Sequence, residues 1–246
     1  MDDVTQDSFF DGRIQLKQHR SGYRYSIDAV LLASAVQPKP QETLVDLGTG
    51  CGIIPLILAF RRPGIRIWGV ELQQQLAAVA EANIRENGMA SQVTILHADM
   101  RDIRPQLVGT PVDTVVSNPP YRNERSGRVN PNEQRALARH ELAITLPEIV
   151  RVSRRLLRTG GRLIMIYTAS RITDLFWHLR AERIEPKRMR LICSHAGSDA
   201  RLVLIEGIKD AGPGVTVSAP LIVYADPGGY SEEVQAMFTS GLSSDP

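Results

Sequence analysis

The chain has 246 residues, a length that suits one large domain better than two complete ones. Hydrophobic residues make up 43%, charged residues 23% and aromatic residues 5%, a composition that excludes a disordered or fibrous protein. No apolar run approaches the roughly 18 residues that span a bilayer, and the acidic start Met1-Asp2-Asp3 is unlike a signal peptide. We therefore expect a cytoplasmic protein without a membrane segment.

The ligand-forming residues are few, and the positive charge is unevenly distributed. Two cysteines and five scattered histidines form no metal-ligand spacing, so we assign neither a metal nor a disulfide framework. The net charge is only +2, yet residues 122–190 contain 16 Lys/Arg against 7 Asp/Glu. Such a stretch is typical of phosphate recognition, although a merely solvated face explains it equally well.

Short apolar runs rich in β-branched residues alternate along the chain with segments of helical period. This order predicts an α/β fold with a mostly parallel sheet. The expected strands cover residues 43–47, 65–70, 93–97, 114–117 and 162–167, and helices are expected at 27–35 and 170–181. Two strands then follow without a helix between them, at 189–194 and 201–207, and predict a hairpin that gives an antiparallel edge strand.

The termini flank this pattern with less regular sequence. We expect an N-terminal extension over residues 1–40, a main domain over 41–208 and a C-terminal tail over 209–246 packed on or near it. The tail is rich in Gly and Pro, with an extended piece predicted at 215–224 and a short helix after Ser231.

A glycine-rich loop follows the first strand of the sheet, in the sequence Asp46-Leu47-Gly48-Thr49-Gly50-Cys51-Gly52. Glycines let a ligand approach the backbone, but their spacing is G-x-G-x-G and not the G-x-G-x-x-G of dinucleotide sites. An acidic residue also stands two positions before the first glycine. A carboxylate there favours the cationic sulfonium and amino group of S-adenosylmethionine, which has no phosphate.

Two more carboxylates stand at or just after the ends of the next strands. Glu71 follows Trp68-Gly69-Val70 and could accept both hydroxyls of a ribose, and Asp99 could accept from an adenine amino group. For each one alone, capping of a helix is an equally good explanation, but three at successive strand ends favour a ligand.

This arrangement resembles the class I S-adenosylmethionine-dependent methyltransferases. The resemblance implies a Rossmann-like, seven-stranded, mostly parallel sheet with one antiparallel strand and helices on both faces. It also implies S-adenosyl-L-methionine as the cofactor, bound by residues at the strand ends: Asp46, Gly48, Thr49, Gly50, Gly52, Glu71, Leu72, Asp99, Met100 and Asn118.

A second motif, Ser117-Asn118-Pro119-Pro120-Tyr121, ends the fourth strand. The prolines fix the backbone and lack N–H donors, which leaves the Asn118 side-chain oxygen and the Pro119 carbonyl as acceptors. Two acceptors that hold the hydrogens of an exocyclic amine favour pyramidal nitrogen, whose lone pair can then attack a methyl group. Tyr121 can stack on the ring of the acceptor. We predict that Asn118, Pro119, Pro120 and Tyr121 form the catalytic motif.

The motif is similar to the signature of amino-methyltransferases that act on adenine N6, cytosine N4 or a glutamine amide. Stretches beginning at Gly22, Ala136 and Glu185 further resemble the bacterial tRNA (valine) adenine-N6 methyltransferase family. That resemblance implies tRNA or another structured RNA as the partner, and we assign RNA contacts to Arg122, Arg125, Arg128 and Arg139. The alternatives are a release-factor glutamine methyltransferase and an rRNA base methyltransferase. A dinucleotide-dependent oxidoreductase and a catalytically silent cofactor-binding module are more distant ones.

Overall fold

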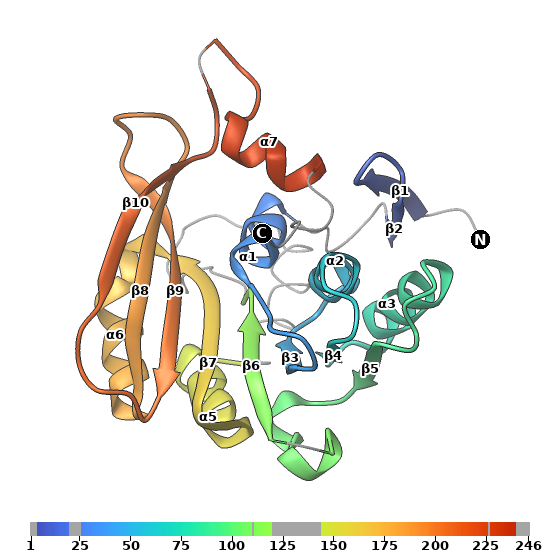
Figure 1. The fold of residues 1–246 in the computed structure, drawn as a ribbon, viewed down its shortest axis with the longest axis horizontal. Coiled ribbons are helices and arrows are strands. Elements are labelled where there is room, and N and C mark those ends of the chain that lie inside the picture. The colour runs from blue at the N-terminus through green and yellow to red at the C-terminus, as the bar shows by residue number, and fades with distance from the viewer. Residues whose placement is uncertain (1–3, 20–25, 110, 120–143, 226, 240–246) are drawn as a thin grey trace, which may run out of the picture.

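A mixed sheet forms the centre of the computed structural model, which describes residues 4–19, 26–109, 111–119, 144–225 and 227–239 (Figure 1). Its strands are β3 (Thr43–Leu47), β4 (Arg66–Glu71), β5 (Val93–His97), β6 (Val112–Ser117), β7 (Leu157–Thr168), β8 (Ile184–Cys193), β9 (Ala200–Lys209) and β10 (Thr216–Ile222). Their order across the sheet is β10-β8-β9-β7-β6-β3-β4-β5.

The strands that precede the predicted site residues are direct neighbours and run in parallel. Strand β3 lies between β6 and β4, with Leu47 paired to Ser117 on one side and to Val70 on the other. Strand β5 continues this half of the sheet, with His97 opposite Glu71. The residues that follow these strands therefore emerge side by side along one edge of the sheet.

The predicted α/β fold is confirmed, with two corrections to the sheet. Within the described residues it has eight strands and not seven, because the extended piece of the tail pairs in parallel with β8 as strand β10. Much of β10 is exposed, and its sequence lacks the buried apolar run of central strands such as β3 and β6. The one antiparallel strand is β9, but it is not at the edge, because it pairs with both β7 and β8.

Helices cover both faces of the sheet (Figure 1). One face is covered by α1 (Ile27–Ala35), α2 (Ile53–Arg61) and α3 (Gln74–Glu86), and the other by α5 (Leu146–Leu156) and α6 (Ile172–Ala181). Leu32 and Ile57 belong to the hydrophobic core of the first face, and Ile149 and Leu175 to that of the second. The C-terminal helix α7 (Glu232–Thr239) contacts α1.

A separate two-stranded sheet near the N-terminus was not predicted. Strands β1 (Val4–Phe9) and β2 (Ile14–His19) form an antiparallel hairpin that contacts α3. Ile14 and Leu16 are almost completely buried, as is Phe10 in the turn, so the hairpin joins the core of the first face. The hairpin has only a few apolar residues among many polar ones, so its sequence shows no clear strand pattern. Its burial becomes evident only from its packing against α3.

Candidate active site

The structure brings the described members of the predicted site together at the carboxyl edge of strands β6, β3, β4 and β5. Asn118 and Pro119 directly follow β6, and the glycine loop directly follows β3. Glu71 is the last residue of β4, and Asp99 lies two residues after β5. Open α/β sheets bind their ligands at this edge.

The glycine loop is held against the neighbouring strand by its backbone. The N–H groups of Gly48 and Thr49 both donate to the Val70 carbonyl, at 2.9 and 3.0 Å. Gly48 and Gly52 have φ values of +79° and +83°, a left-handed conformation that side chains disfavour. At Gly52 a Cβ atom would also lie 3.2 Å from the Cβ of Ala80 on α3. Larger residues would therefore strain the loop and displace it from the helix.

Asp46 carries a buried carboxyl group directly beneath this loop. The residue is 1% exposed, and neither carboxylate oxygen accepts a hydrogen bond within the described ranges. The pKa of Asp46 is raised to about 7, mainly by burial and also by the negative charge of Glu71, while the nearby Thr49 side chain lowers it. A buried carboxylate without a donor is costly for a protein. It is stabilised if a ligand brings a positive charge or a hydrogen-bond donor.

Glu71 connects the loop to the start of α3. One carboxylate oxygen accepts from the Gly50 N–H at 2.9 Å, and the other accepts from the Gln73 N–H at 2.8 Å. Each oxygen of a carboxylate can accept about two hydrogen bonds, so both retain capacity for a ribose hydroxyl. The adjacent Leu72 is 42% exposed, so its side chain is accessible to a ligand. A flat apolar ring could cover it.

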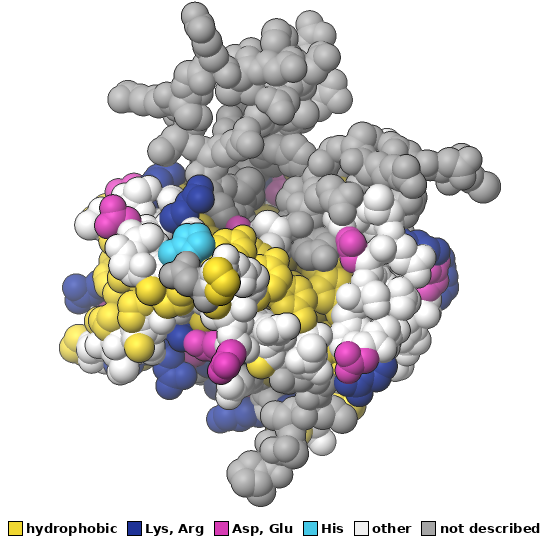
Figure 2. All heavy atoms as spheres, turned by 90° about the horizontal axis from the view of Figure 1, so that it is seen from above, with side chains coloured by type: hydrophobic (Ala, Val, Ile, Leu, Met, Phe, Trp, Pro, Cys, Tyr) yellow, Lys and Arg dark blue, Asp and Glu magenta, His cyan; other side chains and the backbone are white. Residues whose placement is uncertain are grey.

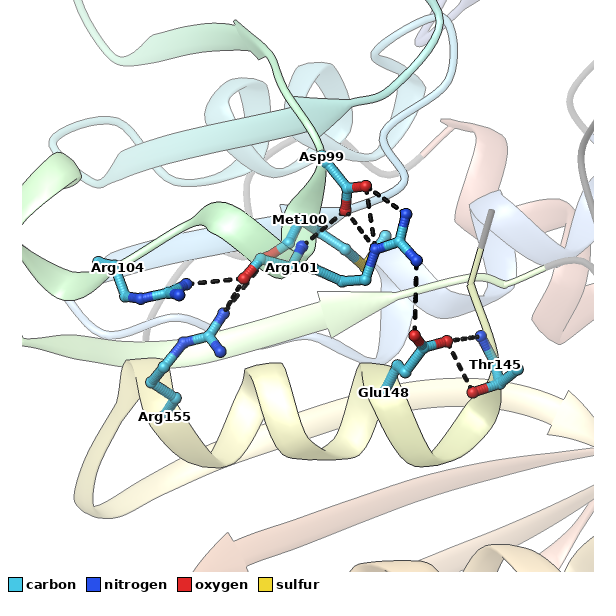
Figure 3. Close-up of polar contacts among 7 residues, drawn as sticks. All are labelled: Asp99, Met100, Arg101, Arg104, Thr145, Glu148 and Arg155. Carbon is cyan, nitrogen blue, oxygen red and sulfur yellow. Dashed lines mark hydrogen bonds and ion pairs between the residues drawn. The ribbon is translucent and has the colours of Figure 1, made fainter. Parts of the chain in front are cut away.

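Asp99 is already engaged by Arg101 (Figure 3). It accepts from the Arg101 backbone N–H at 2.8 Å and from Nε at 3.0 Å, and these bonds hold the pKa of Asp99 below its usual range. A carboxylate offers about four acceptor positions. With the further bond from Arg101 Nη2, Arg101 occupies most of the acceptor positions of Asp99. An adenine amine at Asp99 would therefore share the carboxylate with Arg101 or displace it.

Arg101 also reaches the first turn of helix α5. Its guanidinium lies 3.6 Å from Glu148, whose carboxylate accepts from the backbone N–H and the hydroxyl of Thr145 (Figure 3). Arg155, from the last turn of the same helix, donates to the Arg101 carbonyl at 2.9 Å. Helix α5 thus fixes the segment that carries Asp99 and Met100 at two points.

Two residues that support the site were not predicted. Gly69 leaves room for the Thr49 side chain, because a Cβ atom at Gly69 would lie 3.0 Å from Thr49 Cγ2 and Oγ1. The buried Ser117 hydroxyl donates to the Leu47 carbonyl at 2.9 Å and joins the ends of β6 and β3. A glycine inside a strand is the sequence signal for a close approach of this kind.

Several predicted residues lie outside the described residues: Pro120, Tyr121, Arg122, Arg125, Arg128 and Arg139. On the described surface in Figure 2, hydrophobic side chains gather in the middle and acidic and basic ones lie mainly towards the rim. The described surface seen in this view therefore shows no continuous basic patch.

The described parts of the chain contain neither clustered metal ligands nor a membrane-spanning helix. No three His, Cys, Asp or Glu side chains there come together as a group that could hold a metal ion. No helix in those ranges has the length and apolar character needed to cross a bilayer.

Comparison with known proteins agrees with the fold and identifies the family. A model of the methyltransferase small domain matches residues 23–173. A tRNA1(Val) (adenine(37)-N6)-methyltransferase of Porphyromonas gingivalis is 30% identical over 206 residues, which cover 81% of this chain and 80% of the relative. A relative of the same name from Aeromonas salmonicida is 23% identical, covering 89% and 90% of the two chains.

Among solved structures, a predicted O-methyltransferase of Agrobacterium tumefaciens superposes with a TM-score of 0.70 at 21% identity, covering 89% of this chain and all of the other. A geranyl diphosphate methyltransferase superposes with a TM-score of 0.53 at 17% identity, covering 74% of this chain and 77% of the other.

The sheet order and these structural neighbours define a class I methyltransferase fold. The chain belongs to the methyltransferase small domain family. The predictions of a Rossmann-like fold and of a methyltransferase are therefore confirmed.

The residues at the strand ends fit S-adenosylmethionine. The orphaned carboxylate of Asp46 suits the positive charge of the cofactor. Gly48 and Gly52 have no side chains, so the methionine portion of the cofactor could lie close to the loop backbone. Glu71 would hold the ribose, with Leu72 and Met100 on the adenine ring. When bound, the cofactor supplies an electrophilic methyl group.

Proposed function

We propose that the protein transfers a methyl group from S-adenosylmethionine to N6 of an adenine in tRNA. The observation that carries the proposal is the position of Asn118, at the end of β6 and directly beside the strand that bears Asp46. The relatives that share this family are named for transfer to adenine 37 of a valine tRNA, and we extend that substrate to this chain.

The acceptor motif would hold the amine rather than deprotonate it. The Asn118 oxygen and the Pro119 carbonyl accept the two hydrogens of the exocyclic amine, and Asn118 is half-buried while Pro119 is buried. Held in this way, the nitrogen would present its lone pair to the methyl group that S-adenosylmethionine would supply, and S-adenosylhomocysteine would be the leaving group. The proton leaves the nitrogen afterwards, so no strong base is required. Alignment of the reacting atoms can lower such barriers by about 7 to 11 kcal/mol.

The target adenine has to leave its stack to reach Asn118. This requirement favours a nucleotide in a loop over one inside a duplex, and an anticodon loop meets it. The arginines that follow the motif, Arg122, Arg125 and Arg128, would neutralise phosphates of the RNA backbone.

The test compares methyl transfer to RNA and to protein over a salt series. Radiolabelled S-adenosylmethionine is supplied with tRNA or with release factor, and label is expected in tRNA, with affinity falling steeply as salt rises. Replacement of Arg122, Arg125 and Arg128 by glutamine should flatten the salt dependence and leave cofactor binding unchanged. Label in release factor alone would refute the RNA substrate while leaving the methyltransferase fold intact.

A further inference from the structure

One buried side chain on helix α3 joins the N-terminal hairpin to the glycine loop. Asn83 has no exposed surface, and its amide nitrogen donates to the Cys51 carbonyl at 2.9 Å and to the Lys17 carbonyl at 2.8 Å. Its oxygen accepts from the Lys17 N–H at 2.8 Å. Both hydrogens of the amide are therefore used, one towards the loop and one towards the hairpin.

We propose that Asn83 is a positioning residue that holds the glycine loop in the conformation required for the cofactor. Cys51 lies between Gly50, whose N–H donates to Glu71, and Gly52, whose N–H donates to the Thr49 carbonyl at 3.0 Å. The Cys51 carbonyl and the Gly52 N–H belong to the same planar peptide unit. Asn83 fixes one side of that plane and Thr49 fixes the other, which determines how the loop faces the cofactor.

Two asparagine side chains at the C-terminal end of α3 attach the hairpin to the helix. Each side-chain amide bonds to both the backbone N–H and the backbone carbonyl of one residue of β2. Asn87, one helical turn after Asn83, accepts from the Gln15 N–H at 2.9 Å and donates to the Gln15 carbonyl at 2.7 Å. Residues four apart share a face of a helix, and residues two apart share a side of a strand. The two asparagines thus match Gln15 and Lys17 of β2.

Only one member of this pair contacts the glycine loop. Asn87 directly follows the last residue of α3, and its second donor hydrogen goes to the Asn83 backbone carbonyl of the helix at 2.8 Å. Asn87 therefore provides a matched control. It makes the same two kinds of hydrogen bond to the hairpin, and among the described contacts it makes no hydrogen bond to the glycine loop. The inference rests on the proposed function through the cofactor alone and does not depend on the methyl acceptor.

The experiment compares Asn83→Ser with Asn87→Ser, since serine is too short to reach either carbonyl and brings no charge. Calorimetric titration with S-adenosylhomocysteine should show a dissociation constant about tenfold higher for Asn83→Ser, equivalent to about 1.4 kcal/mol, and an unchanged one for Asn87→Ser. The KM for S-adenosylmethionine should rise in parallel for Asn83→Ser, while kcat at saturation stays at the wild-type value. Equal weakening in both variants, or none in Asn83→Ser, would overturn the proposal.

A measurement on the unmodified protein guards against a variant that fails to fold. Coupling between two sites is reciprocal, so cofactor that orders the loop should also stabilise the hairpin. Amide hydrogen exchange at Lys17 should slow when S-adenosylhomocysteine binds, and unchanged exchange there would overturn the proposal. A wild-type protein that binds no S-adenosylhomocysteine or S-adenosylmethionine would instead refute the proposed function.

Discussion

The buried carboxyl group of Asp46 leads to a prediction about pH and cofactor affinity. Burial raises its pKa from 3.8 to about 7, so at pH 5 the free protein carries it protonated. A cationic ligand favours the ionised form, and cofactor binding should therefore release a proton below pH 7. If the pKa returns to about 4 in the complex, affinity should fall by about a hundredfold between pH 7.5 and pH 5.

The same shift has a consequence for stability. The unfolded chain ionises Asp46 near its ordinary pKa, whereas the folded chain keeps the proton until about pH 7. Stability therefore decreases as pH rises from about 4 to 7, by about 4 kcal/mol for a shift of about three pH units. Asp46→Asn removes this loss, so the variant should be more stable than the wild type at pH 8 and should bind the cofactor more weakly.

Calorimetry in two buffers of different ionisation enthalpy measures the released proton directly, and urea unfolding at pH 4.5 and pH 8 measures the stability. Asp46→Asn is the control, and its affinity should not change over this pH range. Cofactor affinity that is independent of pH in the wild type, with no proton released, would contradict the assignment of Asp46 to the cofactor.

Four further predictions concern the loop, the ribose site, the acceptor motif and the choice of cofactor. Gly69→Ala should destabilise the fold by about 1 to 3 kcal/mol and weaken cofactor binding, because its Cβ would lie 2.8 Å from Ile95 Cδ1 and 3.0 Å from the Thr49 side chain. Urea unfolding measures the loss of stability, and calorimetry measures the loss of affinity. Glu71→Ala should weaken cofactor binding without unfolding the chain, as circular dichroism would check. Asn118→Ala should abolish transfer in a radiolabel assay while cofactor affinity is retained, and Asn118→Asp should be milder because the oxygen acceptor remains; equal inactivity of the two would mean that the amide hydrogens matter. Calorimetry should detect S-adenosylmethionine binding and no NAD binding.

The elements with strong local signals were predicted well from the sequence. The strands at 43–47 and 93–97 and the helix at 27–35 have the predicted bounds, because apolar runs bounded by glycine, proline or polar residues mark them directly. The grouping of Asp46, Glu71 and Asn118 at one edge followed from the rule for parallel strands.

The features that depend on tertiary contacts could not be predicted in this way. The hairpin at residues 4–19 is held by Asn83 and Asn87, which lie more than 60 residues away in the sequence. The ion pair of Arg101 with Glu148 of α5 and the space that Gly69 leaves for Thr49 likewise appear only when strands and helices are packed together. Local patterns in a sequence contain no record of these partners.

The central claim is methyl transfer to adenine N6 in tRNA, and mass spectrometry of nucleosides tests it most directly. tRNA lacking the modification is incubated with S-adenosylmethionine and the protein, digested to nucleosides and compared with a parallel reaction containing Asn118→Ala. N6-methyladenosine should appear with the wild-type protein and not with the variant. A methylated nucleoside other than N6-methyladenosine, or no methylated nucleoside while release factor is methylated, would contradict the account.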